Sequence, residues 1–207
     1  MYAENICESH GFYSFDVIFV GNRMLSVRLK VPGLHNVKNA LAAISAALLS
    51  GVSAESVKKG LEGFRGMKRR FEFIGRCADA DVYDDYAHHP TEIRATLDCA
   101  KRLGYKKIIC AFQGHTYSRT AALFNDFVEA FDGVDEAVLT DIYAAREENV
   151  YGVSGRALAE SVKNGTYISD LGELTEYLRG RAERGTLILT LGAGGLNEVA
   201  KELTGGC

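Results

Sequence analysis

The sequence predicts an α/β protein with a mostly parallel β-sheet and helices on both faces, preceded by a smaller hairpin-and-helix segment. From residue 71 onward, short apolar runs alternate repeatedly with amphipathic stretches, which is typical of successive βαβ units. Before that point the pattern is a β-rich pair of segments followed by two helical ones. The basic run at 68–70 separates these two sequence patterns.

The first two predicted strands are residues 12–20 and 24–31, which are rich in β-branched and aromatic residues. Gly21-Asn22 lies between them, and glycine in the first central position predicts a tight hairpin with a type II′ turn. Pro32-Gly33 should then end the second strand.

Two helices are predicted next. Apolar residues from Val37 to Leu48 recur at helical spacing, and Gly51 is a typical C-terminal stop. Ser53 is a good N-cap for a second helix that runs through Leu61. A hairpin with two helices makes a poor independent core, so we expect residues 1–66 to be the end of a larger domain and residues 67–207 to be a second domain.

The remaining elements follow in strand–helix pairs. We expect strands at residues 82–86, 107–113, 136–143, 167–168 and 186–191, and helices at residues 91–103, 119–131, 154–162, 171–181 and 196–203. In sheets of this kind, ligands bind beyond the carboxyl ends of the strands.

Composition limits the possible functions. The chain has 207 residues, of which 47% are hydrophobic and 25% are charged, and its net charge is −3, so we expect neither nucleic-acid nor membrane partners. The first residues do not resemble a secretory signal, which favours the cytoplasm. The cysteines form no CxxC pair and are expected to be free thiols: Cys7, Cys77, Cys99, Cys110 and Cys207.

Polar or glycine-rich clusters follow four of the predicted strands, and these could carry chemistry. They are DDYAHHPTE at 84–92, FQGHTYSRT at 112–120, DIYAARE at 141–147 and GAGG at 192–195. Any one of them could simply supply a helix cap. Because the carboxyl ends of parallel strands meet at one edge, all four together predict a ligand site there.

Several motifs are absent from the sequence. It has no GxxxxGK[ST] phosphate loop, no complete dinucleotide-binding fingerprint and no GxSxG nucleophile elbow. None of the cysteines has a neighbouring base in the sequence that would activate its thiol.

In their order along the chain, these motifs resemble the C-terminal half of the ATP-dependent Mur ligases. The matching segments are GLHNVKNALAA (33–43), GMKRRFE (66–72), the clusters at 84–92, 112–120 and 141–147, and GAG (192–194). The resemblance is greatest to the type that joins L-alanine to UDP-N-acetylmuramate in peptidoglycan precursor synthesis. It implies that residues 1–66 end the central ATPase domain and that residues 67–207 are the C-terminal Rossmann-like domain.

The resemblance also implies a nucleotide site. Asn36 and Asn39 match a pair that contacts adenine, Arg70 matches an arginine that reaches ATP, and Asp85 matches the acidic residue that holds the ribose hydroxyls. Asn36 could instead, or in addition, be a helix N-cap, and Arg70 could belong to a solvated basic linker. The phosphate-loop lysine and the ligands of Mg²⁺ are expected in the N-terminal half of the same ligase, so residues 1–207 alone should be inactive.

Tyr86, His88, His115 and Arg119 match the region that faces the acyl phosphate and the incoming amino acid. A guanidinium suits the alanine carboxylate, so Arg119 is the expected carboxylate-binding residue. The attacking amine must lose a proton, and His88 or His115 could assist or merely orient it. Gly192 and Gly194 would let the backbone approach the substrate closely.

Two positions depart from the family pattern: Gly114 replaces an expected proline, and Thr116 occupies a position where arginine is frequent.

Two other functions stay open at this point. Carboxylates and imidazoles at the first two strand ends could bind a divalent metal in a phosphohydrolase, the candidate ligands being Asp84, Asp85, His88, His89 and His115. The chain could also be a non-catalytic nucleotide-binding or interaction module.

Overall fold

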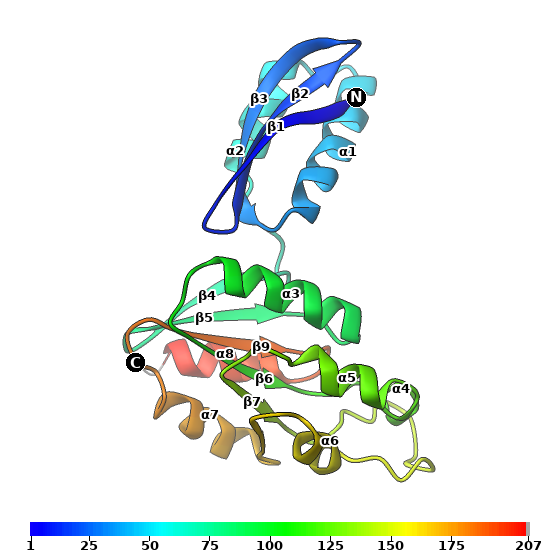
Figure 1. Ribbon diagram of the computed structural model, residues 1–207, viewed down its shortest axis with the longest axis vertical. Helices are drawn as coiled ribbons and strands as arrows, with labels where there is room; N and C mark the ends of the chain where they lie inside the picture. Colours follow the sequence, from blue (N-terminus) through cyan, green and yellow to red (C-terminus); the bar gives the residue numbers. More distant parts are fainter. Residues whose placement is uncertain (206–207) are drawn as a thin grey trace. The chain divides into compact units, whose positions relative to one another are not determined.

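The computed structural model describes residues 1–205, and the chain divides into two compact units, Met1–Gly66 and Met67–Cys207 (Figure 1). The division lies immediately before the basic run Lys68–Arg70.

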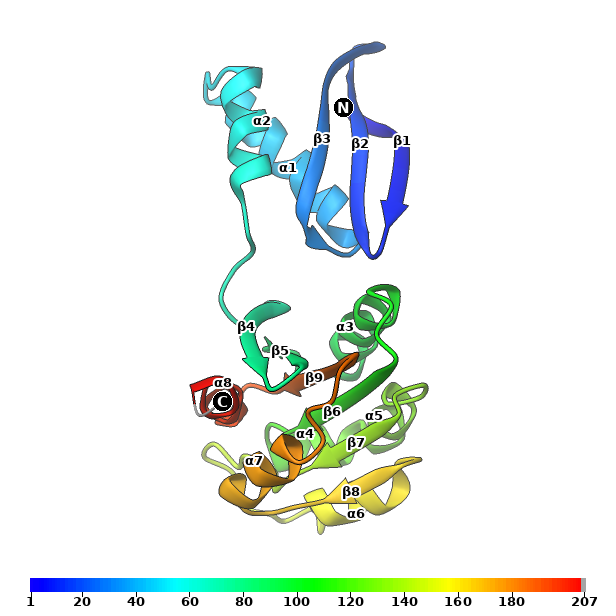
Figure 2. The same ribbon diagram turned by 90° about the vertical axis from the view of Figure 1, so that its left-hand side faces the viewer.

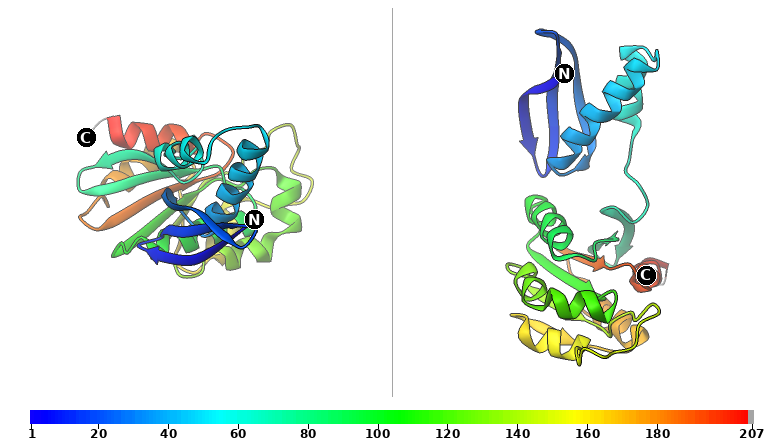
Figure 3. Two further views of the ribbon diagram at one scale, coloured as in Figure 1. Left: turned by 90° about the horizontal axis from the view of Figure 1, so that it is seen from above. Right: turned by 90° about the vertical axis from the view of Figure 1, so that its right-hand side faces the viewer.

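The first unit is a three-stranded antiparallel sheet with two helices on one face (Figure 3, right). Its strands are β1 (Tyr2–Ser9), β2 (Phe12–Phe19) and β3 (Asn22–Pro32), in the order β1-β2-β3. Alternate residues of β2 and β3 point to the helices and are buried, whereas their neighbours face the other side. This period of two is typical of a sheet with one face covered, and both strands predicted from their β-branched and aromatic residues are present.

Two features of this sheet differ from the prediction. Strand β1 was not predicted, because nearly all of its residues are exposed and the strand therefore has no apolar alternation. The turn between β2 and β3 contains Val20 and Gly21, with φ of 49° and 76°, and Phe19 pairs with Asn22. Positive φ at both central residues defines a type I′ turn, so the predicted type II′ turn at Gly21-Asn22 was wrong by one position.

The two predicted helices of the first unit are present. Helix α1 (His35–Leu49) is followed by Gly51 with a φ of 83°, the left-handed conformation that typically ends a helix. Helix α2 (Ala54–Gly63) begins after Ser53, whose side chain accepts a hydrogen bond from the Ser56 amide at 3.2 Å. The prediction of Ser53 as N-cap is therefore confirmed.

The second unit is a six-stranded sheet in the order β4-β5-β9-β6-β7-β8, in which only the edge strand β4 is antiparallel. The strands are β4 (Glu72–Cys77), β5 (Ala80–Asp85), β6 (Lys107–Phe112), β7 (Glu136–Leu139), β8 (Gly165–Tyr167) and β9 (Thr186–Leu191). Strands β6 and β9 are almost entirely buried, as the apolar runs of central parallel strands require.

Helices cover both faces of this sheet (Figure 2). Helices α3 (Pro90–Arg102), α5 (Phe124–Ala130) and α6 (Gly155–Ser161) pack against one face, and α7 (Leu171–Arg179) and α8 (Leu196–Gly205) pack against the other. Two apolar cores result, one on each side of the sheet. The predicted α/β class, with a mostly parallel sheet between two helical layers, is confirmed.

Details of the second unit again differ from the prediction. Strand β4 was not predicted, and the single helix expected at 119–131 is two helices, α4 (Tyr117–Ala122) and α5, separated at Leu123. Strand β7 ends at Leu139 instead of residue 143, so the segment from Thr140 onward is free to turn. The last strand, β9, inserts between β5 and β6, which the order of elements along the chain did not reveal.

The described cysteines are free thiols: Cys7 is exposed, and Cys77, Cys99 and Cys110 are buried. Burial raises the pKa of the Cys99 thiol to about 12. Cys207 lies outside the described residues. Within residues 1–205, no helix combines the length and the apolar character needed to span a membrane.

Candidate functional site

The carboxyl ends of β5, β9, β6 and β7 lie side by side at one edge of the six-stranded sheet. We call this edge, with the residues that follow each strand, the rim. It contains the four polar or glycine-rich clusters that the sequence places after strands. Because β9 lies between β5 and β6, its GAGG turn is adjacent to both histidine-bearing strand ends.

The two aspartates that end β5 have separate partners. Asp84 is 1% exposed, and its carboxylate receives hydrogen bonds from Arg69 Nε at 3.1 Å and Thr190 Oγ1 at 2.7 Å. Asp85 is 7% exposed and accepts hydrogen bonds from the Phe71 and Ala87 amides, each at 2.8 Å. Adjacent strand residues point to opposite faces, so the two carboxylates do not form a pair.

The two arginines of the basic run differ in their contacts. Arg69 pairs with Asp84, donates to the Gly192 carbonyl at 2.6 Å and lies over the Tyr86 ring at 4.9 Å. Arg70 is exposed, with its guanidinium 5.7 Å from the centre of the same ring. Burial raises the pKa of Asp85, and the charge of Arg70 is among the effects that oppose this increase.

Sequence analysis singled out Arg70 and missed Arg69. Lys68-Arg69-Arg70 looks like one charge run, and nothing in it indicates that the middle residue lies against a buried carboxylate.

A row of rings crosses the rim. Tyr86 contacts His88, His88 contacts His115 and His115 contacts Tyr143, with ring centres 5.2, 5.8 and 5.7 Å apart. These residues follow β5, β6 and β7. His115 and Tyr143 also form an isolated parallel β-bridge, which continues the pairing of β6 and β7 beyond the strands. The structure therefore brings together three predicted residues and adds Tyr143, which sequence analysis placed in a motif without assigning it a role.

The hydrogen-bond partners distinguish the two histidines. His88 Nδ1 lies 2.9 Å from the Tyr86 carbonyl, which can only accept, so Nδ1 carries the proton and neutral His88 has its lone pair on Nε2. His115 Nδ1 lies 3.5 Å from a guanidinium nitrogen of Arg119, which can only donate, and this long contact favours the tautomer of neutral His115 with its proton on Nε2. One imidazole therefore presents a proton acceptor, and the other presents a donor.

The pKa of His115 is lowered, mainly by partial burial and further by the positive charges of Arg119 and of protonated His88, while Glu147 and a backbone hydrogen bond act in the opposite direction. Because an unperturbed imidazole titrates near pH 6.5, this lowering keeps His115 neutral at pH 7.

Arg119 lies in α4, the short helix that follows the second motif, and is partly buried. Ser118, the preceding residue, is tied to Glu147: its amide donates to Oε2 at 2.8 Å and its hydroxyl donates to Oε1 at 2.5 Å. These bonds lower the pKa of the Glu147 carboxyl. Glu147 had no assigned role in the sequence analysis, because its contact with Ser118 depends on how the segment after β7 turns back.

Gln113 explains why glycines are needed after β9. Its side chain donates to the Asp141 carbonyl at 3.3 Å and accepts from the Gly195 amide at 2.9 Å, which joins two strand ends. A Cβ at Gly194 would lie 2.0 Å from Gln113 Oε1, and one at Gly192, with φ of 145°, would lie 2.8 Å from the Gln113 carbonyl oxygen. These glycines allow a close approach to Gln113, and the approach of their backbone to a substrate stays a prediction.

The two departures from the family pattern are both accommodated. A Cβ at Gly114 would lie 3.2 Å from Thr120 Oγ1, so the turn is tight there. Thr116 adopts a φ of 69° and caps α4, with its hydroxyl 3.4 Å from the Arg119 amide.

Asn36 and Asn39 belong to α1 of the first unit. Asn36 donates to the Pro32 carbonyl at 2.7 Å, and Asn39 donates to Asn36 Oδ1 at 3.0 Å. The helix begins one residue before Asn36, with Leu34 at the N-cap position, so the alternative of Asn36 as N-cap was wrong.

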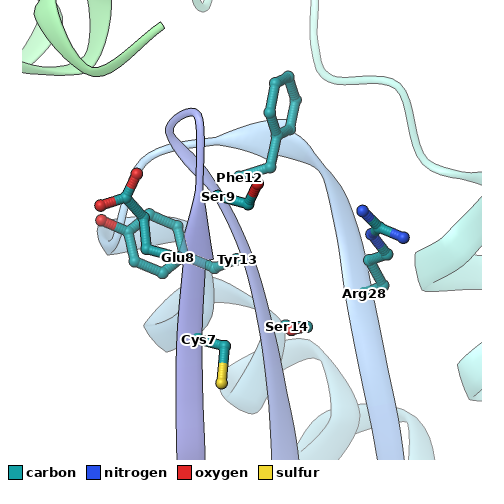
Figure 4. A pocket seen from close by; sticks show the side chains of 7 residues that line it. All are labelled: Cys7, Glu8, Ser9, Phe12, Tyr13, Ser14 and Arg28. Carbon is teal, nitrogen blue, oxygen red and sulfur yellow. The ribbon is translucent and has the colours of Figure 1, made fainter.

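The first unit also has a cavity of about 310 Å³ on its sheet (Figure 4). Residues from all three strands line it: Cys7, Glu8, Ser9, Phe12, Tyr13, Ser14 and Arg28. None of the predicted site residues is among them.

No group of three or more histidine, cysteine, aspartate or glutamate side chains within residues 1–205 is arranged to hold a metal ion. Of the candidate ligands, His89 caps α3, its Nδ1 accepting from the Thr91 amide at 3.3 Å. The candidate aspartates are held by the partners described above.

Residues 69–194 match the family model described as the Mur ligase, glutamate ligase domain. The chain belongs to the Mur ligase family. The matched region runs from Arg69 to Gly194 and contains the rim except for Gly195, the last residue of the GAGG cluster.

Individual Mur ligases match over most of this chain. The UDP-N-acetylmuramate–L-alanine ligase of Clostridium acetobutylicum is 47% identical over 204 residues, which are 96% of this chain and 44% of that protein. The enzyme of the same name from Caldanaerobacter subterraneus is 44% identical over 94% of this chain and 43% of its own. The crystal structure of UDP-N-acetylmuramate–alanine ligase from Thermotoga maritima superimposes with a TM-score of 0.80 at 31% identity, covering 97% of this chain and 44% of the other. The chain therefore spans less than half the length of these relatives.

Proposed function

We propose that this chain is the C-terminal part of an ATP-dependent ligase that joins L-alanine to UDP-N-acetylmuramate in peptidoglycan precursor synthesis. The observation that carries the proposal is the arrangement of His88, His115 and Arg119 at the rim, where a proton acceptor, a donor and a guanidinium converge from two strand ends. Relatives that are 47% and 44% identical to this chain carry the name of this activity.

In the proposed reaction, ATP converts the lactyl carboxylate of UDP-N-acetylmuramate into an acyl phosphate, which the amine of L-alanine attacks with release of ADP and phosphate. Arg119 binds the alanine carboxylate, because a guanidinium can donate two parallel hydrogen bonds to it. Tyr86, which contacts His88, forms one wall of the same site.

The histidines have different roles in this proposal. His88 Nε2 accepts the proton that the ammonium group of alanine must lose before it can attack. His115 keeps its proton on Nε2 and donates a hydrogen bond to the reacting groups, while its Nδ1 orients Arg119. The substrate lies within reach of the turn at Gly194.

ATP with Mg²⁺ supplies the phosphoryl group that activates the carboxylate. The exposed residues Asn39 and Arg70 can hydrogen-bond to a nucleotide, and Asn36 holds Asn39 in place. Asp85, which is 7% exposed and accepts two backbone amides, is the proposed partner of the ribose hydroxyls. The phosphate loop and the Mg²⁺ ligands are assigned to the N-terminal half of the ligase, which makes that half an obligatory partner.

The test compares residues 1–207 with the complete ligase. The complete ligase should release phosphate only when ATP, L-alanine and UDP-N-acetylmuramate are all present, and mass spectrometry should detect the alanylated product. Residues 1–207 alone should release no phosphate above background. Ligation by residues 1–207 alone, or phosphate release by the complete protein that does not depend on L-alanine, would contradict the proposal.

A further inference from the structure

The segment between β7 and α6 is held at the rim by backbone hydrogen bonds of Tyr143 with Gly114 and Thr116, and by the side chain of Glu147. After β7 the chain turns back, with the Glu147 amide donating to the Ala144 carbonyl at 3.0 Å and Ala145 at a φ of 56°. This turn places the Glu147 carboxylate against the first turn of α4, where both its oxygens accept from Ser118.

Helix α4 needs this carboxylate because its own cap is weak. The hydroxyl of Thr116 lies 3.4 Å from the Arg119 amide, which is long for a hydrogen bond, whereas the Ser118 amide reaches Glu147 at 2.8 Å. Bonds to an ionised acceptor are also stronger than bonds between neutral groups. Thr116 has a positive φ, which is unfavourable for a β-branched residue, so the start of α4 depends on contacts from outside the helix.

The helix carries Arg119 immediately after Ser118, so the position of Ser118 determines where the guanidinium lies relative to His115. We propose that Glu147 is a positioning residue for this site: by gripping Ser118 with both carboxylate oxygens, it holds Arg119 beside His115 in the orientation that binds the amino-acid substrate. The reference to a substrate rests on the function proposed above; the positioning of Arg119 and His115 does not.

The same carboxylate offsets the positive charges around His115. The charged and titratable groups that face this imidazole are Arg119 on α4, His88 after β5, and Tyr143 and Glu147 after β7. Arg119 and protonated His88 disfavour protonation of His115, and Glu147 favours it. Removing the charge of Glu147 while keeping its shape should therefore lower the pKa of His115 further.

Two substitutions separate the two effects. Glu147→Gln keeps an acceptor for the Ser118 amide and removes the charge, whereas Glu147→Ala removes both. The matched control is Glu148→Gln, which removes the same charge from the next residue, whose side chain is exposed.

In the complete ligase, Glu147→Ala should lower kcat/KM for L-alanine about 10- to 100-fold, because a binding group is displaced from its orientation. The KM for ATP should change less than about threefold. Glu147→Gln should lose less than about fivefold, because it keeps an acceptor for the Ser118 amide. The proposal would be overturned if Glu147→Ala and Glu147→Gln lost equal kcat/KM for L-alanine. It would also be overturned if the alanine kinetics of the Glu147→Ala protein matched those of the Glu148→Gln protein.

A second measurement uses residues 1–207 and no activity. Titration followed by NMR of the histidine ring protons should show a lower pKa for His115 in Glu147→Gln than in the unsubstituted chain, and no change in Glu148→Gln. An unchanged His115 titration overturns the proposed role of Glu147 even if the complete protein is a ligase. A shifted titration in a protein without ligase activity upholds the role of Glu147 and refutes the proposed function instead.

Discussion

At the scale of single residues, the rim shows how identical side chains acquire different chemistry from their hydrogen-bond partners. A carbonyl fixes the proton of His88 on Nδ1, and a guanidinium favours an unprotonated Nδ1 on His115. In the same way, Asp84 accepts hydrogen bonds from the side chains of Arg69 and Thr190, whereas Asp85 accepts them from backbone amides. Of the residues at the rim, Arg119 is the one whose proposed role is most directly testable by substitution.

Arg119→Ala in the complete ligase should weaken the use of L-alanine far more than the use of ATP. A desolvated guanidinium–carboxylate pair contributes about 2–4 kcal/mol, so kcat/KM for alanine should fall about 30- to 1000-fold while the apparent KM for ATP stays within a few fold. Steady-state kinetics with each substrate varied in turn measures both values.

Arg119→Lys is the matched variant. An ammonium keeps the charge but cannot reproduce the planar pair of donors, so it should restore only part of the activity. If Arg119→Ala leaves alanine kinetics near those of the unsubstituted enzyme and only lowers its stability, Arg119 supports the fold of α4 and does not bind the substrate.

At the scale of elements, the segment between β7 and α6 is held in its middle by Glu147 and at its end by the packing of Gly155. Glu147 attaches it to α4, and Gly155, the first residue of α6, packs directly on the backbone after β7. A Cβ at Gly155 would lie 2.1 Å from the Thr140 carbonyl oxygen, so this helix can start here only if residue 155 has no side chain. Ser154 then caps the helix by accepting from the Ala157 amide at 3.1 Å.

Gly155→Ala should therefore destabilise the second unit by about 1–3 kcal/mol, the cost of forcing a methyl group into a closely packed site. Urea unfolding of residues 1–207, followed by the signal of the second unit, measures the change. Gly180→Ala is the control in the same unit, since a Cβ there would lie 3.6 Å from the nearest atom, the Glu176 carbonyl oxygen, and has room. Equal stability of the two variants would show that the backbone at Thr140 can move away.

At the scale of the whole molecule, the chain corresponds to only part of the length of its relatives. It matches relatives over less than half of their length, and its sequence contains no phosphate-loop motif. The residues proposed to bind ATP contact the adenine, the ribose and one phosphate, whereas a phosphate loop normally contributes most of the phosphate contacts.

Residues 1–207 should therefore bind ATP weakly, with a Kd of about 1 mM or above, corresponding to about −4 kcal/mol. Isothermal titration calorimetry with ATP and Mg²⁺ measures this. A sub-micromolar Kd would mean that the nucleotide site has been assigned to the wrong residues.

The local pattern of the sequence determined most of the elements and the rim. Their β-branched and aromatic residues identified β2 and β3, apolar runs identified β6 and β9, and capping chemistry located the start of α2 at Ser53. The motifs after the strands indicated His88, His115 and Arg119 before any contact was known, because strand ends of a parallel sheet meet at one edge.

Tertiary structure decided what depends on pairing between distant segments. The insertion of β9 between β5 and β6, the burial of Arg69 against Asp84 and the contact of Glu147 with Ser118 join residues far apart in the chain. Strands β1 and β4 lie at sheet edges, where few side chains are buried and the apolar period is weak. Periodicity reports only which residues of a segment face an apolar surface, and the neighbouring segment that provides this surface is fixed when the chain packs.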